Sequence, residues 1–166
     1  MPDKKDQILF VCTGNICRSP MAEYILRARL GLHAAWQVAS AGVAAVSGLP
    51  ASAAAVQVCT ELNVDLRPHR SQPVTQELLH ASQWIVVMTE SHREQLLHLY
   101  PAAAPRLRLL KSFGFSEAFG DIPDPIGGSI EVYRTVRNQI ESALSDLILF
   151  LMEQNGWLWS GKEHTQ

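Results

Sequence analysis

Short apolar segments alternate with helix-forming segments along this chain, and that order limits the folds open to it. Four segments are brief and apolar enough to be strands: residues 8–11, 36–39, 84–88 and 107–110. Helical spacing or helix-start signals mark four others: residues 20–30, 50–62, 91–99 and 133–151. Short buried strands separated by helices indicate an α/β domain, with a parallel sheet covered by helices on both faces.

Length and charge exclude several other classes. The 166 residues suit one domain, expected at residues 1–155, with a poorly ordered tail at 156–166. A net charge of -2 gives no support for a nucleic-acid partner. The first apolar run is too short for a secretory signal, and no run is long enough to span a bilayer. Three cysteines, an odd number, fit reduced thiols, so we expect a cytoplasmic protein that does not bind membranes.

The most informative segment joins the first predicted strand to the first predicted helix. It reads Cys12-Thr-Gly-Asn-Ile-Cys-Arg18-Ser19-Pro20, with Pro20 suited to a helix start. Backbone N–H groups and the positive helix end would make this loop a cradle for an anion. Gly14 is expected to supply backbone angles closed to other residues, and Arg18 a planar fork for two phosphate oxygens. The expected substrate-binding residues are Thr13, Gly14, Asn15, Ile16, Cys17 and Ser19.

The same segment predicts nucleophilic chemistry. A thiol at a helix N-terminus near an arginine is stabilised as the thiolate, and a thiolate held under a phosphate can attack phosphorus. Cys12 is therefore the predicted nucleophile, and Ser19 is expected to donate a hydrogen bond to its sulfur. An isolated cysteine is more often an ordinary core residue. Here cysteine, glycine, arginine and serine all stand where a phosphate cradle needs them.

A cysteine phosphatase also needs an acid for the leaving group. Asp124 is the candidate, because Pro123 and Pro125 on either side would stiffen its backbone. An Asp-Pro pair on its own is equally consistent with a surface turn.

Taken together, these motifs resemble the low-molecular-weight protein tyrosine phosphatases over residues 8–152. The matching pieces are the segments 11–23, 40–42, 69–71, 87–88 and 124–128. The resemblance implies a four-stranded parallel sheet with helices on both faces. It implies Cys12 as nucleophile, Arg18 as phosphate clamp and Asp124 as acid and then base, without a metal or other cofactor. Asn15, Ser40 and His69 are similar to the polar residues that support the loop in that family.

The resemblance leaves the substrate, a phosphorylated protein, open between two classes. Segments 41–43, 88–92 and 124–133 resemble a bacterial branch that acts on phosphoarginine, and the aromatic residue typical of tyrosine enzymes after Asp-Pro is here Ile126. The arginine branch, however, resembles this chain less at Ile16, where it carries threonine and the tyrosine enzymes carry an aliphatic residue. Because Ile16 would line the reaction site, we favour phosphotyrosine.

Two further functions fit the pattern less well. Arsenate reduction on this fold would need more cysteines to relay a disulfide after the third strand, and residues 89–99 contain none. A non-catalytic phosphate-binding module would need neither a reactive Cys12 nor an acid at Asp124. Cys17, in the same loop as Cys12, is in addition a candidate partner for a protective disulfide.

Overall fold

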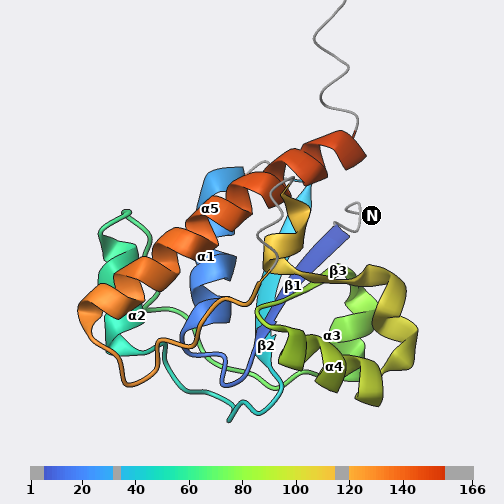
Figure 1. Ribbon diagram of the computed structural model, residues 1–166, viewed down its shortest axis with the longest axis horizontal. Helices are drawn as coiled ribbons and strands as arrows, with labels where there is room; N and C mark the ends of the chain where they lie inside the picture. Colours follow the sequence, from blue (N-terminus) through green and yellow to red (C-terminus); the bar gives the residue numbers. More distant parts are fainter. Residues whose placement is uncertain (1–5, 32–34, 115–119, 156–166) are drawn as a thin grey trace, which may run out of the picture.

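Four parallel strands form the centre of the structure, a computed structural model that describes residues 6–31, 35–114 and 120–155. The strands are β1 (Asp6–Cys12), β2 (Trp36–Gly42), β3 (Ser82–Val87) and β4 (Leu107–Leu109). They lie in the order β2-β1-β3-β4, and every neighbouring pair is parallel (Figure 1). The predicted four-stranded parallel sheet is therefore confirmed.

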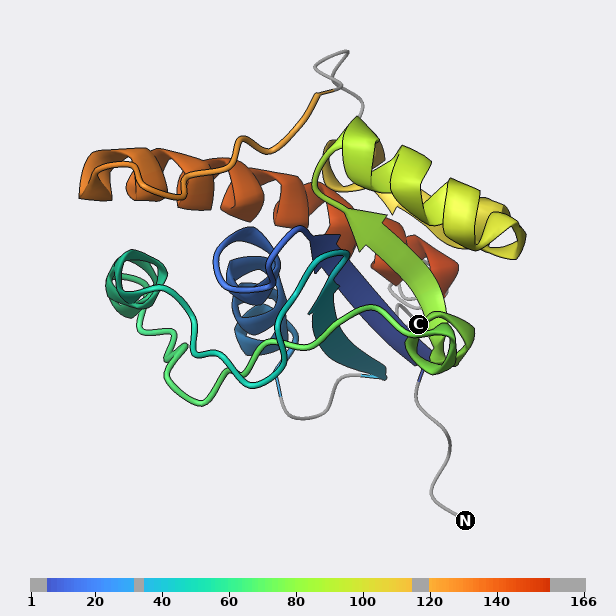
Figure 2. The ribbon, with the colours of Figure 1, turned by 90° about the horizontal axis from the view of Figure 1, so that it is seen from below.

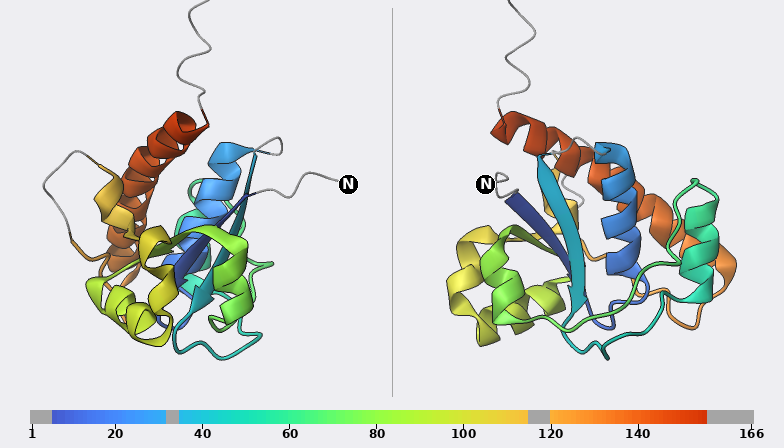
Figure 3. Two further views of the ribbon diagram at one scale, coloured as in Figure 1. Left: turned by 90° about the vertical axis from the view of Figure 1, so that its right-hand side faces the viewer. Right: turned by 180° about the vertical axis from the view of Figure 1, so that it is seen from behind.

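Helices cover both faces of this sheet (Figure 2). On one face lie α1 (Arg18–Leu30), α2 (Ala53–Thr60) and α5 (Ile130–Gln154). On the other lie α3 (Gln76–Ala81), α4 (Glu90–Leu99) and the 3₁₀ turn η1 (Pro101–Arg106). A second 3₁₀ turn, η2 (Leu110–Phe113), follows β4. The two views of Figure 3 show the sheet between these layers.

The central strand β1 explains why its sequence is apolar without interruption. Ile8 and Phe10 pack on the α1 and α5 side, while Leu9 and Val11 pack on the α3 and α4 side. All four side chains are fully buried. A strand covered on both faces has no solvent side, so it shows no alternation of polar and apolar residues.

Some elements differ from the sequence-based expectation. α3 was not predicted, because six residues with one buried side chain, Leu79, carry no readable period. α2 begins at Ala53 rather than at Pro50, since the Ser52 side chain accepts a hydrogen bond from the Ala55 N–H and caps the helix there. The predicted tail at 156–166 lies outside the described residues. None of the helices in the described part is both long enough and apolar enough to cross a bilayer.

The strand order determines where a ligand can bind. From β1 the chain turns to β2 on one side, and it later adds β3 on the other. In open α/β sheets, ligands usually bind at the carboxyl ends of the two strands between which the strand order reverses. Cys12 ends β1, and Met88 follows the parallel strand β3 at the same edge of the sheet.

Candidate active site

The loop after β1 leads directly into an uncapped helix. Arg18 is the first residue of α1, and its N-cap residue Cys17 makes no side-chain capping hydrogen bond. The first backbone N–H groups of a helix have no partner within the helix, so they remain available to an anion. Pro20 fits in this first turn because no N–H is required there.

The sharp turn of the loop is at Asn15 and not at Gly14. Asn15 has φ 56°, in the left-handed region, whereas Gly14 does not have a positive φ. The expectation that Gly14 supplies the unusual backbone angle is therefore wrong. Asparagine tolerates this conformation better than most residues because its short polar side chain can form local hydrogen bonds.

Segments distant in sequence hold the loop in this shape. The Asn15 carbonyl oxygen lies 2.7 Å from Nε2 of the buried His69. The Asn15 side-chain oxygen accepts a hydrogen bond of 3.0 Å from the Gln72 N–H. At the end of β2, a Cβ on Gly42 would lie 2.4 Å from the Thr13 carbonyl oxygen, so only glycine fits at that position.

A chain of hydrogen bonds runs from a buried carboxylate to the Cys12 sulfur. Ser40 Oγ donates to Glu23 Oε1 at 2.6 Å. The Asn15 amide donates to Ser40 Oγ at 2.9 Å and to Ser19 Oγ at 2.8 Å. Ser19 Oγ lies 2.9 Å from Cys12 Sγ. Because the Ser19 oxygen accepts from Asn15, its own proton is available to the sulfur.

Arg18 and Asp124 meet beside this loop. The buried Arg18 guanidinium donates to the Ile122 carbonyl oxygen at 3.0 Å, which fixes its plane. Its other terminal nitrogen lies 3.5 Å from Asp124 Oδ2, and the Asp124 side chain is 45% exposed. Asp124 Oδ1 accepts from the Ile126 N–H at 3.1 Å, so the carboxylate is oriented by its own turn. The Asp124 carboxylate is thus partly open to solvent and lies next to a buried guanidinium.

Asp121, the other carboxylate of this segment, is engaged elsewhere. Its Oδ1 accepts a hydrogen bond of 2.8 Å from the Glu90 N–H at the start of α4. This contact stabilises a helix N-terminus, which is an ordinary structural role for an aspartate.

The Cys17 side chain contacts the helix layer. Its Sγ lies 3.4 Å from Ser52 Oγ and 3.4 Å from the Tyr133 hydroxyl. Burial raises the pKa of the Cys17 thiol, and the hydrogen bonds with Ser52 and Tyr133 only partly oppose this. The thiol is therefore neutral at neutral pH.

Two other predicted substrate-binding residues, Thr13 and Ile16, are not fully buried. Thr13 is exposed, and its Oγ1 lies 2.9 Å from Nε2 of His92 in α4. Ile16 is half-buried and packs against the core on the α1, α2 and α5 side, and its carbonyl oxygen accepts from the Ser52 N–H at 2.9 Å. An aliphatic surface thus lies next to the cradle.

Sequence reasoning assigned no role to Glu23 or to His92, which both connect to this site. Glu23 follows Ser19 by four residues, so helical spacing places both on one face of α1. The partners Ser40 and Thr13 come from other elements, 17 residues from Glu23 and 79 residues from His92. A helical period gives no information about contacts of this kind.

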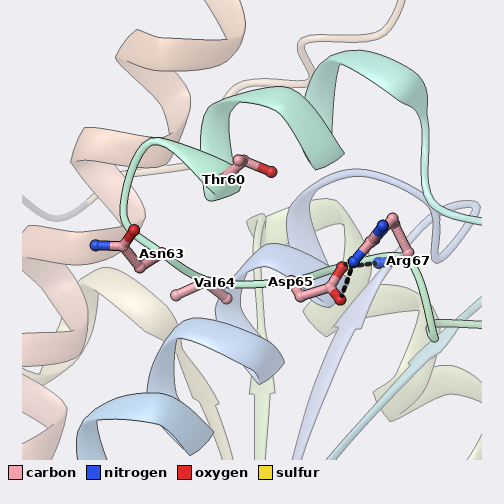
Figure 4. A pocket seen from close by; sticks show the side chains of 5 residues that line it. All are labelled: Thr60, Asn63, Val64, Asp65 and Arg67. Carbon is pink, nitrogen blue, oxygen red and sulfur yellow. Dashed lines mark hydrogen bonds and ion pairs between the residues drawn. The ribbon is translucent and has the colours of Figure 1, made fainter.

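A separate pocket lies away from the loop. It has a volume of about 430 Å³ and is lined by Thr60, Asn63, Val64, Asp65 and Arg67 (Figure 4). Arg67 is turned back on Asp65, with two side-chain hydrogen bonds of 2.9 Å. This pairing neutralises the one cation of the lining, so the pocket does not offer a free positive charge to a phosphate.

Comparison with known proteins relates the chain to a family of phosphatases. The model of the family described as low molecular weight phosphotyrosine protein phosphatase matches residues 7–156. The chain is 39% identical over 143 residues to the Protein-arginine-phosphatase of Geobacillus stearothermophilus, a match that covers 85% of this chain and 93% of that protein.

Two solved structures agree with the fold over most of the chain. The YwlE arginine phosphatase from Geobacillus stearothermophilus has a TM-score of 0.84 and 36% identity, and the match covers 96% of this chain and 99% of that one. The low molecular weight protein tyrosine phosphatase from T. tengcongensis has a TM-score of 0.81 and 38% identity, covering 87% of this chain and 98% of that one.

Proposed function

Because the chain belongs to the low molecular weight phosphotyrosine protein phosphatase family, we propose that it hydrolyses phosphotyrosine side chains of proteins through a phosphorylated Cys12. One observation carries the proposal. The hydroxyl of Ser19 lies 2.9 Å from the Cys12 sulfur, at the start of the helix whose first residue, Arg18, reaches to within 3.5 Å of Asp124. The residues proposed as nucleophile, phosphate clamp and proton donor are thus neighbours, which supports the proposal.

In the first step the Cys12 thiolate attacks phosphorus. The S–P bond forms as the bond from phosphorus to the phenolic oxygen breaks, and protonated Asp124 gives its proton to that oxygen. Arg18 and the free N–H groups at the start of α1 bind the equatorial oxygens, where charge is concentrated.

In the second step water attacks the phosphocysteine. Asp124, now a carboxylate, takes a proton from that water as the O–P bond forms and the S–P bond breaks. The sulfur leaves as a thiolate, and the Ser19 hydroxyl stabilises it by donating a hydrogen bond. Inorganic phosphate then dissociates from the cradle.

Apolar side chains beside the loop support an aryl ester as substrate. Ile16 is half-buried next to the cradle, and Ile126, two residues after Asp124, is 56% exposed. A phenyl ring can lie against such surfaces without losing hydrogen bonds, whereas a guanidinium would leave N–H groups without acceptors there.

Phosphoarginine is the second candidate substrate. It is favoured by the Protein-arginine-phosphatase that is 39% identical to the chain and by the solved arginine phosphatase structure with a TM-score of 0.84. The hydroxyl of a threonine in place of Ile16 would provide the polar contact that a guanidinium needs.

A parallel assay tests the proposal. We expect the purified protein to have a higher kcat/KM for phosphotyrosine peptides than for phosphoarginine peptides of the same sequence, and Ile16→Thr to narrow the difference. Cys12→Ser should abolish turnover of both, and Arg18→Lys should reduce it severely because a point charge cannot replace the fork. A preference of the wild type for phosphoarginine would overturn the substrate assignment, and substantial turnover by Cys12→Ser would overturn the mechanism.

A further inference from the structure

His92 connects α4 to the catalytic loop across the crevice between β1 and β3. Thr89 caps α4, and its Oγ1 accepts a hydrogen bond of 3.1 Å from the His92 N–H, which fixes the first turn of the helix. The imidazole is only 3% exposed. Its Nε2 lies 2.9 Å from Oγ1 of Thr13, the residue that follows the nucleophile.

The surroundings of the ring determine the direction of this hydrogen bond. His92 Nδ1 is buried and has no partner among the described residues. A proton on Nδ1 would leave a buried N–H without an acceptor, which is rarer in proteins than an acceptor without a donor. The proton therefore belongs on Nε2, which donates to Thr13 Oγ1.

The ring remains neutral at neutral pH. Burial and, to a smaller extent, the nearby charge of Arg18 lower the pKa of His92 to about 4, while Asp121 and Asp124 act in the opposite direction. The Nε2–H donor is present in both the neutral and the protonated ring, so the direction of the bond does not change with pH.

The Thr13 hydroxyl can therefore still donate one hydrogen bond. Its oxygen accepts from His92, and its own proton has no acceptor among the described residues. Thr13 is exposed at the opening of the loop, directly after Cys12. We propose that His92 is a positioning residue, which holds the Thr13 hydroxyl as a hydrogen-bond donor to an oxygen of the bound phosphoryl group.

This inference rests on the proposed function. It implies that His92 and Thr13 act through the same contact with the phosphoryl group. Loss of a hydrogen bond to a charged group typically weakens binding about tenfold or more. Thr13→Val should therefore raise the inhibition constant of inorganic phosphate and lower kcat/KM for a phosphotyrosine peptide, each about tenfold. His92→Phe, which fills the space but has no donor, should have a similar effect through Thr13.

A double-mutant cycle tests the coupling. The double variant should be no worse than either single variant, because both changes remove the same contact. His92→Gln, whose amide nitrogen can occupy the place of Nε2, should retain most of the wild-type phosphate affinity. His98→Gln, at the exposed end of the same helix, is the matched control and should leave all constants unchanged. Thermal midpoints show which variants are folded, and His92→Leu replaces His92→Phe if that variant does not fold.

The outcomes separate this inference from the proposed function. Absence of turnover in the wild type would contradict the proposed function. An active wild type with additive effects of the two changes, or with His92→Gln as impaired as His92→Phe, would overturn the role of His92 alone. An unchanged inhibition constant for phosphate in Thr13→Val would show that its hydroxyl does not reach the phosphoryl group.

Discussion

Glu23 carries its carboxylate inside the protein, where Ser40 and Arg27 both donate to it. A carboxylate can only accept hydrogen bonds, so Ser40 must direct its proton to Glu23 and accept from Asn15. The Asn15 oxygen is occupied by the Gln72 N–H, so the Asn15 amide group donates to Ser40 and to Ser19, which leaves the Ser19 proton to the sulfur of Cys12. The Glu23 charge thus fixes the direction of the Ser40 hydrogen bond, and through Ser40 it helps to hold the Asn15 amide in place beside Ser19.

Replacing this charge should weaken the chain of hydrogen bonds at its buried end. The Gln side chain in Glu23→Gln can donate to Ser40 and then competes with the Asn15 amide for the Ser40 oxygen, which loosens the support of Asn15 beside Ser19. We expect kcat to fall about tenfold, the order of one lost hydrogen bond to a charged group, and iodoacetate to alkylate Cys12 more slowly at neutral pH. Glu94→Gln, on the exposed side of α4, is the control. An unchanged alkylation rate would exclude the long-range effect of Glu23.

The two carboxylates of the segment after Gly120 should behave differently. Asp124→Asn should lower kcat about 10²–10⁴-fold, the usual contribution of a general acid. The loss should be smaller with p-nitrophenyl phosphate than with phenyl phosphate, because the better leaving group departs without a proton. Asp121→Asn should affect the stability of α4 more than the rate. If Asp121→Asn is the more damaging change for kcat, the acid has been assigned to the wrong residue.

At the scale of elements, the close approach of β2 to the loop leaves no room for a side chain. In Gly42→Ala the new Cβ would lie 2.4 Å from the Thr13 carbonyl oxygen and 3.0 Å from the Asn15 nitrogen, and both are backbone atoms. We expect the free energy of unfolding to fall by about 2 kcal/mol or more and activity to be largely lost. Gly120→Ala, where the nearest atom is 4.0 Å away, should have little effect. Retained activity in Gly42→Ala would mean that the loop tolerates displacement.

Cys17, the residue directly before α1, is the predicted protector of Cys12 against oxidation. Cys12 is the predicted target of peroxide, and Cys17 follows in the same loop. We expect dithiothreitol to restore activity to peroxide-treated wild type, because it reduces a disulfide between Cys12 and Cys17. It should not restore activity to Cys17→Ala, in which Cys12 can be oxidised irreversibly. Cys59→Ala is the internal control, because the Cys59 thiol is fully buried on α2 and burial raises its pKa to about 12. Equal recovery of all three proteins would show that Cys17 protects nothing.

The elements also show which features a sequence reveals. The strands of the buried sheet and the long helix α5 were predictable, because burial imposes a period or an apolar run on the residues themselves. α3 was not, since six residues are too few to show a period. In the site, the loop residues and Asp124 were predictable, because they belong to two short motifs that can be read directly from the sequence. The contacts of Glu23 with Ser40 and of His92 with Thr13 depend on how separate elements meet, which no local pattern encodes.

For the whole molecule, the buried His92 predicts a pH dependence of stability. In the unfolded chain a histidine has a pKa of about 6.5, whereas burial lowers the pKa of His92 to about 4. Between these values the unfolded state binds the extra proton and the folded state does not. Stability should therefore fall as the pH decreases from about 6.5 to about 4, by on the order of 2–3 kcal/mol.

Urea unfolding at a series of pH values measures this effect. His92→Gln should flatten the dependence in that interval, whereas His98→Gln, an exposed change on the same helix, should keep the wild-type slope. A slope that is the same in wild type and His92→Gln would assign the pH dependence to other groups.

The packing of Gly42, His69 and Gln72 on the loop has a consequence for how new specificities can be obtained. Thr13, Asn15 and Cys17 each contact other segments, so a change at these residues requires matching changes elsewhere at the same time. Val46, Leu49 and Ile126, in contrast, belong to the segments that flank the loop, and their side chains are exposed. A library randomised at these three positions should therefore yield active variants with altered peptide selectivity far more often than one randomised at residues 13–17.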